Sequence, residues 1–179
     1  ALNLPGFDNY REVLIESAGA RIALSIYDAG KERPCIVFLP GTMTHPLMYA
    51  DFLALLAENG FNAAGVHFLS HGKSPRDKKL YTFDDMLSNT SDAITYCMEN
   101  INDKIILMGS SQGGILSIAA ACKEDRIRAV FPHNILLPSL PESICITRFP
   151  RSLQYCVAPL KSLIKIAAAT MPSLRVPIT

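Results

Sequence analysis

The residues with the clearest chemical meaning are Gly109-Ser-Ser-Gln-Gly113, which have the form G-x-S-x-G around Ser111. A serine attacks carbonyl carbons when a sharp turn between a strand and a helix exposes its hydroxyl at the end of a sheet. Such a turn brings the helix close to the strands, so both flanking positions favour glycine, which has no Cβ to clash. The pattern therefore predicts Ser111 as a nucleophile.

A different interpretation of the same serines is structural. Ser110 and Ser111 precede an Ala-rich stretch, and serine is a favoured N-cap residue of helices. Capping alone, however, explains neither Gly109 and Gly113 nor the apolar strand that comes before them. The context thus favours the nucleophile.

An attack by Ser111 would place negative charge on the carbonyl oxygen of the substrate, and this charge needs two hydrogen-bond donors. The N–H of Gln112, at the start of the helix, is the first candidate. The second is the N–H of Thr42 in the Pro-Gly-Thr turn that follows the apolar run 35–39, because that turn should reach the same end of the sheet. Thr42 and Gln112 are therefore the predicted oxyanion donors.

The elements that must position these groups alternate along the chain after an opening hairpin. Apolar alternation and continuous apolar runs predict strands at 11–17, 21–28, 35–39, 61–68, 104–109 and 127–131. Helical spacing predicts helices at 47–59, 83–100 and 112–122. This alternation predicts an α/β fold: a mostly parallel sheet with helices on both faces.

Composition and charge narrow the class of protein. The chain has 179 residues, 49% of them hydrophobic and 18% charged, as expected for one globular domain. Its net charge of +1 provides no field that would gather nucleic acid. The five cysteines are scattered, with no C-x-x-C pair, so we expect no metal, no cofactor and a reducing, cytoplasmic location. Neither a leader peptide nor a membrane-spanning run is predicted.

The sequence changes character after residue 138. Prolines divide the segment, and no acidic residue occurs between 143 and 179, where five residues are basic. We therefore divide the chain into 1–138, part of a core, and 139–179, the start of a helical cap or lid. The best helix there, 158–171, has a broad apolar face, which suits either docking on the core or a lid over an apolar substrate site. The basic residues also suit peripheral contact with a membrane.

Two further motifs accompany the serine. Leu39-Pro-Gly-Thr-Met-Thr-His45 and His67-Phe-Leu-Ser-His-Gly-Lys-Ser74 resemble the oxyanion turn and the D-x-x-G-H-G-x-S loop of one family. This family is that of the α/β-hydrolases of the monoacylglycerol lipase, lysophospholipase and serine aminopeptidase type, and the resemblance covers roughly 12–138. It implies the α/β-hydrolase fold, Ser111 as the nucleophile, and Thr42 and Gln112 as the backbone donors of the oxyanion hole.

The resemblance is incomplete at three positions. Pro40 stands where the family usually has His, His67 where it has Asp, and Ser70 where it has Gly. The loop that begins at His67 is therefore expected to be held differently. His71 matches the family pattern and implies a residue that braces this loop. His45 is interpreted either as lining the pocket entrance or as a solvent-facing turn residue.

A serine nucleophile needs a histidine base that is oriented by a carboxylate. The family places both after the nucleophile, on loops that follow two further strands. The chain resembles the N-terminal part of this fold, truncated after the sixth strand and the start of the cap, so the remainder is expected from another segment or another chain. His133 follows the last strand, but no acidic residue lies nearby to orient it, and a pocket-lining or buried role is the better interpretation.

Three functions remain open on these grounds. The leading hypothesis is a serine hydrolase that cleaves carboxylic esters with an apolar acyl group through an acyl-enzyme on Ser111. A peptidase or thioesterase with the same mechanism is the close alternative, because nothing in the sequence identifies the leaving group. A non-catalytic binding module of hydrolase-like fold is favoured only if the chain ends at Thr179.

Overall fold

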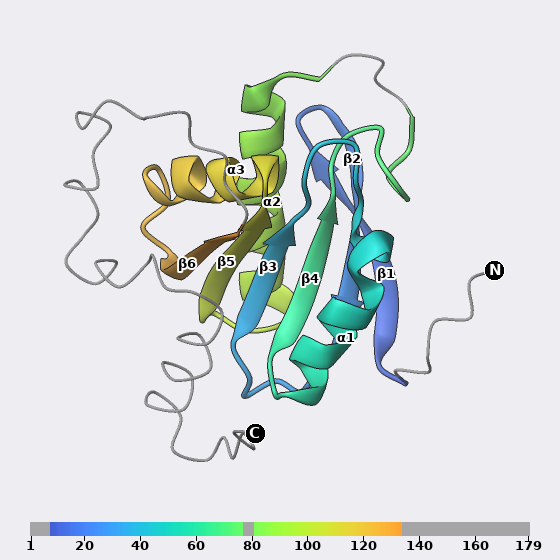
Figure 1. The fold of residues 1–179 in the computed structure, drawn as a ribbon, viewed down its shortest axis with the longest axis vertical. Helices are drawn as coiled ribbons and strands as arrows, with labels where there is room; N and C mark the ends of the chain where they lie inside the picture. The colour runs from blue at the N-terminus through green and yellow to red at the C-terminus, as the bar shows by residue number, and fades with distance from the viewer. Residues whose placement is uncertain (1–7, 77–80, 134–179) are drawn as a thin grey trace.

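The computed structural model of the protein describes residues 8–76 and 81–133 (Figure 1). These residues form one sheet in the strand order β1-β2-β4-β3-β5-β6. The strands are β1 (Tyr10–Ser17), β2 (Ala20–Tyr27), β3 (Cys35–Leu39), β4 (Asn62–His67), β5 (Ile105–Ser110) and β6 (Ile127–His133). The helices are the 3-10 helix η1 (Pro46–Tyr49), α1 (Ala50–Glu58), α2 (Phe83–Asn100) and α3 (Gln112–Ala121).

The sheet has an antiparallel edge and a parallel centre. β1 pairs with β2, and β2 with β4, in antiparallel register, whereas β4, β3, β5 and β6 are parallel neighbours. Every residue of β3 and β4 is buried, as expected for central strands covered on both faces. The carboxyl ends of the four parallel strands share one edge of the sheet, so the turns after β3, β4 and β5 are neighbours there.

Helices cover both faces of the sheet and define two core clusters (Figure 1). On one face, α2 and α3 pack through residues such as Ile94 and Leu116. On the other, α1 packs through Leu53 and Ala57. The predicted arrangement, a mostly parallel sheet between helices, is confirmed.

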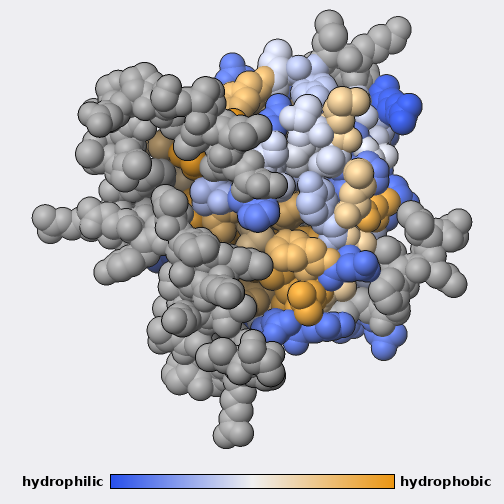
Figure 2. All heavy atoms as spheres, in the orientation of Figure 1, coloured by the Kyte–Doolittle hydropathy of each residue, from blue (hydrophilic) through white to orange (hydrophobic). Residues whose placement is uncertain are grey.

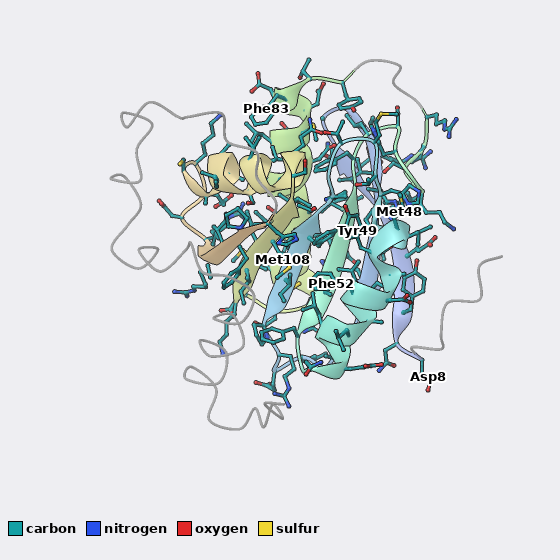
Figure 3. The ribbon with its side chains drawn as sticks, in the orientation of Figure 1. Asp8, Met48, Tyr49, Phe52, Phe83 and Met108 are labelled. Carbon is teal, nitrogen blue, oxygen red and sulfur yellow. The ribbon has the colours of Figure 1, made fainter. Side chains whose placement is uncertain are left out.

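Apolar side chains also gather beside α1 on the face shown in Figure 2. Tyr49 and Phe52 pack against the core cluster on the α1 side of the sheet, and their ring centroids lie 4.8 and 6.0 Å from that of Phe38 in β3. Figure 3 shows Tyr49 and Phe52 on the same side of the ribbon as Met108 of β5, which belongs to the same cluster. The start of α1 is thus anchored on the sheet by aromatic contacts.

Local chemistry explains where the helices begin and end. Thr82 and Asp85 form a reciprocal capping box at the start of α2, and Asp84 adds a second carboxylate near the positive end of the helix dipole. Gly60 follows α1 with a φ of 84°, a conformation that glycine adopts without steric cost.

The structure differs from the sequence prediction at two element ends. The helix predicted at 47–59 begins instead as η1, with Pro46 in its first turn, and becomes α-helical only at Ala50. β6 continues through Pro132 to His133, two residues beyond the predicted end, so that His133 pairs with Ser110.

The predicted cap 139–179 and its helix 158–171 lie outside the described residues. Within the described part of the chain, no helix has the length and apolar character needed to cross a membrane.

Candidate active site

The G-x-S-x-G segment forms a sharp turn from strand to helix. β5 ends at Ser110 and α3 begins at Gln112, which leaves Ser111 alone between them with φ 53° and ψ −115°. A non-glycine residue in this region is strained by roughly 1–3 kcal/mol and persists where the surrounding structure enforces it. The Ser111 side chain makes no capping hydrogen bond to α3, so capping does not account for the residue.

Backbone hydrogen bonds hold this turn on both sides. The N–H of Ser111 donates to the carbonyl oxygen of His133 over 2.8 Å. The carbonyl oxygen of Ser111 accepts from the N–H groups of Gly114 and Ile115, at 2.9 and 3.2 Å. The backbone of Ser111 is therefore fixed while the residue itself is exposed.

Close backbone packing explains both flanking glycines. A Cβ on Gly109 would lie 2.0 Å from the carbonyl oxygen of Gly113. A Cβ on Gly113 would lie 2.0 Å from the carbonyl oxygen of Leu39, at the end of β3. These separations are far below any carbon–oxygen contact, so neither position accepts a side chain without a shift of the backbone.

The turn after β3 lies directly against the serine. A Cβ on Gly41 would be 3.3 Å from the carbonyl oxygen of Ser110 and 3.4 Å from the Cβ of Ser111. The N–H and the hydroxyl of Thr44 both donate to the carbonyl oxygen of Gly41, at 3.2 and 2.9 Å, and close the turn. Thr42 and Met43 form its tip, where Met43 has a φ of 58°.

The two predicted oxyanion residues contact each other through their side chains. The hydroxyl of Thr42 donates to Oε1 of Gln112 over 2.9 Å. Gln112 is also the first residue of α3, so its N–H has no acceptor within the helix. No acidic residue occupies the first turn of α3, which leaves the positive end of the helix dipole uncompensated by a side chain.

His67 is one of the three departures from the family pattern. It places a buried, neutral imidazole ring where the family usually has the carboxylate of an Asp. Its Nδ1 accepts the N–H of Lys73 over 3.1 Å, so Nε2 carries the proton and donates to the hydroxyl of Ser25, 2.9 Å away. Burial and the neighbouring His45 lower the pKa of His67 to about 4. The loop that begins at His67 is thus held by a neutral imidazole instead of a carboxylate.

The contacts of His71 and the close packing of Gly72 hold the rest of this loop. Nδ1 of His71 donates to the carbonyl oxygen of Leu69 over 2.8 Å, and the Tyr81 hydroxyl lies 3.3 Å from its Nε2, which agrees with a bracing role. Gly72 has a φ of 54°, and a Cβ there would lie 2.2 Å from Nδ1 of His67. Ser70, where the family usually has glycine, also has a positive φ, of 61°.

His45 stacks on His67, with ring centroids 6.1 Å apart and planes inclined by 16°. Its Nδ1 is buried and has no hydrogen-bond partner among the described residues. The ring is thus partly covered rather than fully solvent-facing, and its place at the pocket entrance stays a prediction.

His133 approaches the serine through its backbone. Its carbonyl oxygen holds the N–H of Ser111, while the residue itself is exposed at the end of β6. Over residues 8–76 and 81–133, no histidine ring is hydrogen-bonded to the Ser111 hydroxyl.

The same residues contain no cluster of three His, Cys, Asp or Glu that would hold a metal ion.

Sequence reasoning missed two buried asparagines: Asn89 supports the loop after β4, beside the site, and Asn62 holds the loop at the opposite end of the parallel strands. Asn89 of α2 accepts the N–H of Leu69 over 3.2 Å and donates to the hydroxyl of Ser17 over 2.7 Å. Asn62, at the start of β4, binds three backbone groups of the loop before β3. A polar residue within a buried segment was the available signal for both.

Large apolar side chains are exposed on segments at this edge of the sheet. Met43, on the turn beside Ser111, is 85% exposed, and Ile115, in the first turns of α3, is 43% exposed. Phe83 is 44% exposed at the start of α2, and Figure 3 places it beyond the ends of the parallel strands. Exposed apolar surface is thus present on the turn beside Ser111 and on the starts of α2 and α3.

The strand order, the strained serine between β5 and α3, and the glycine packing define an α/β-hydrolase. A family model described as "Serine aminopeptidase, S33" matches residues 30–176. The chain belongs to this family and has the α/β-hydrolase fold. No curated protein matches the sequence.

Solved structures share the fold at low identity. An esterase from Pyrococcus furiosus is 18% identical, with a TM-score of 0.64, over 70% of this chain and 49% of that chain. The α/β-hydrolase GrgF from Penicillium sp. sh18 is 21% identical, with a TM-score of 0.63, over 68% and 44%. A thioesterase domain from the curacin biosynthetic pathway is 20% identical, with a TM-score of 0.64, over 95% and 56%. The chain thus spans about half the length of the structures that it matches.

Proposed function

We propose that this hydrolase cleaves carboxylic esters through an acyl-enzyme formed on Ser111. The observation that carries the proposal is the strained Ser111 at the strand-to-helix turn, exposed and without a capping role. Strained residues of this kind cluster at active sites. Membership of the hydrolase family adds support from outside the geometry.

The chemistry follows from the groups around the serine. The Ser111 oxygen attacks the carbonyl carbon while a histidine takes its proton, and the resulting oxyanion accepts hydrogen bonds from the N–H groups of Gln112 and Thr42. Collapse of this intermediate expels the alcohol, which takes the proton from the histidine, and leaves the acyl group on Ser111. Water then gives a proton to the histidine and attacks the acyl carbonyl carbon. The bond to the Ser111 oxygen breaks, the carboxylic acid leaves, and the proton returns to Ser111.

We propose that residues outside 1–179 supply the histidine base and its orienting carboxylate. The support is that no imidazole in the described residues is hydrogen-bonded to the Ser111 hydroxyl, and that the match covers only 49% of the Pyrococcus furiosus esterase. His133 is the weaker candidate, because no acidic residue lies nearby in the sequence to orient its ring and only its backbone carbonyl is hydrogen-bonded to Ser111.

An apolar, lipid-like acyl group fits the surroundings best. Met43, Phe83 and Ile115 are exposed on segments at the edge of the sheet where Ser111 lies. The apolar segment 158–171 would serve as a lid over such a substrate, and the basic residues between 143 and 179 would suit an anionic head group or a membrane surface.

A peptidase or thioesterase is the alternative within the same mechanism. The description of the matching family, a serine aminopeptidase, favours the peptidase. Both alternatives use the same nucleophile and oxyanion donors, so they differ from the esterase only in the leaving group.

Hydrolysis of matched substrates tests the proposal. The complete natural polypeptide is assayed with p-nitrophenyl esters of butyrate and laurate, a lauroyl thioester and an aminoacyl p-nitroanilide, alongside Ser111→Ala and Ser110→Ala. Ester cleavage that is lost in Ser111→Ala but retained in Ser110→Ala supports the proposal. Cleavage of only the anilide or only the thioester would transfer the function to the corresponding alternative, and equal rates in both variants would refute Ser111 as the nucleophile.

We also propose a cytoplasmic location, on the chemistry of the cysteines. Cys35 and Cys97 are free and fully buried next to each other, and Cys122 is a free, exposed thiol. The neighbouring Cys97 and burial raise the pKa of the Cys35 thiol well above its usual value, which keeps it inert. Protein from cells is unfolded and alkylated without prior reduction, and the modified residues are identified by mass spectrometry. We expect Cys35, Cys97 and Cys122 all to carry the alkyl group.

A further inference from the structure

A side-chain hydrogen bond joins the two segments that form the predicted oxyanion hole. The Thr42 hydroxyl, on the turn after β3, donates to Oε1 of Gln112, on the first turn of α3, over 2.9 Å. These residues are 70 positions apart in sequence, and each is expected to supply a backbone N–H to the same oxyanion. The side chains therefore tie together the two backbones whose spacing matters.

The Gln112 side chain is oriented from its other end as well. Its Nε2 lies 3.7 Å from the sulfur of Met86 in α2, at the range of a weak hydrogen bond to a thioether. Met86 is 3% exposed and belongs to the core cluster beneath α2 and α3. Because Nε2 faces this fixed sulfur, Oε1 is presented to Thr42.

Thr42 is more exposed to solvent than its partner Gln112. Thr42 and Met43 form the outer tip of the turn and are both exposed, and Met43 adopts the left-handed conformation. Thr44 closes the base of the turn onto Gly41, but this contact does not join the tip to α3. The bond to Gln112 fixes that distance.

The geometry points to Thr42 and Gln112 as positioning residues whose side chains form a strut that holds the two oxyanion N–H groups at their working separation. The inference rests on the proposed function of Ser111. A donor must lie within about 2.7–3.1 Å of the oxyanion, and loss of one donor costs on the order of 10²–10³ in kcat. Loosening one donor without removing it should cost less, about 10-fold, and should act on the transition state rather than on substrate binding.

The test compares substitutions that keep the backbone N–H and change only the strut. Thr42→Val removes the hydroxyl at nearly constant shape, Thr42→Ser keeps it, and Gln112→Met removes the acceptor. Thr95→Val makes the same chemical change on α2, where the hydroxyl instead donates to the carbonyl oxygen of Ser91 and accepts from the guanidinium of Arg126. Each complete polypeptide is assayed for hydrolysis of p-nitrophenyl butyrate, for inhibition by butylboronic acid, which forms a tetrahedral adduct on a serine oxygen, and for its melting temperature.

The strut predicts that Thr42→Val and Gln112→Met each lower kcat about 10-fold, with KM within 2-fold, and weaken butylboronic acid binding by a similar factor. The double variant should be no worse than either single one, because both remove one bond. Thr42→Ser should recover most of the rate, and Thr95→Val should retain the wild-type rate.

Wild-type kcat in Thr42→Val would overturn the strut while leaving the nucleophile in place. A fall in kcat that disappears once the unfolded fraction at the assay temperature is taken into account would overturn it equally. Absence of ester hydrolysis and of fluorophosphonate labelling in the wild-type protein would remove the proposed function itself, and the strut with it. The two failures are therefore distinguishable in one set of measurements.

Discussion

The α-carbon of Gly113 faces the carbonyl oxygen of Leu39 so closely that a Cβ on the glycine would lie 2.0 Å from that oxygen. Gly113 is the second residue of α3, and Leu39 is the last residue of β3. The helix that follows the serine is thus seated on the strand whose turn carries Thr42. The same contact that excludes a side chain at Gly113 brings the two predicted oxyanion segments together.

Gly113→Ala is expected to lower the free energy of unfolding by about 3 kcal/mol or more, because the clash is with backbone and cannot be relieved by a rotamer change. Urea unfolding followed by circular dichroism measures the loss. Gly19→Ala is the matched control: Gly19 has a φ of 72°, and its Cβ position is open, so only about 1 kcal/mol of backbone strain is expected. Equal losses in the two variants would contradict the close packing of α3 on β3.

The pH dependence of stability should report His67. Burial lowers the pKa of its folded form to about 4, whereas the unfolded chain binds the proton near 6.5. Between these values the unfolded state holds more protons, so the free energy of unfolding should fall as the pH falls from about 6.5 to about 4, by roughly 3 kcal/mol in total. Below about pH 4 this contribution no longer changes.

His67→Asn isolates that contribution, because it removes the titrating ring. Glu12, Lys73 and His45 act electrostatically on His67, and all three are present in both proteins. The difference in unfolding free energy between wild type and variant should therefore change with pH mainly from about 6.5 to 4. A difference that is constant over this range would contradict a buried, neutral His67.

We expect the Asn62 side chain to contribute strongly to the free energy of unfolding. Its side chain accepts the N–H of Ala29 at 2.7 Å and donates to the carbonyl oxygens of Gly30 and Arg33 at 2.9 and 2.8 Å. Asn62→Ala leaves these groups without their partner and should cost about 3 kcal/mol in urea unfolding.

Asn59→Ala provides the comparison, since Asn59 makes one exposed hydrogen bond to the carbonyl oxygen of Leu55. Its loss should cost less than about 1 kcal/mol. If Asn62→Ala were as mild as Asn59→Ala, the loop before β3 would not depend on this side chain.

The order of strands and helices could be predicted from the sequence because each element carries its own local pattern. The continuous apolar run 35–39 indicated a strand buried on both faces, and β3 is buried throughout. The ends were harder to predict. Pro132 is a poor strand residue because it lacks an N–H, yet β6 continues through it, since His133 pairs with Ser110 across β5 and β6.

The candidate site was predictable where a motif required a backbone shape and unpredictable where distant side chains meet. The glycines at 109 and 113 follow from the strand-to-helix turn alone. The partners of His67, by contrast, come from β2 and from the loop at Lys73, and the bond from Thr42 to Gln112 joins the turn after β3 to the first turn of α3. No local periodicity encodes such contacts, because they depend on how the sheet brings its loops together.

The central claim, that Ser111 is a nucleophile, is tested most directly by labelling the complete polypeptide with a fluorophosphonate probe and locating the modified residue by mass spectrometry. We predict a single adduct on Ser111 that is absent from Ser111→Ala and retained in Ser110→Ala. Pretreatment with a slowly hydrolysed p-nitrophenyl ester should block it. A folded, complete protein that remains unlabelled, or that carries the adduct on a residue other than Ser111, would contradict the account.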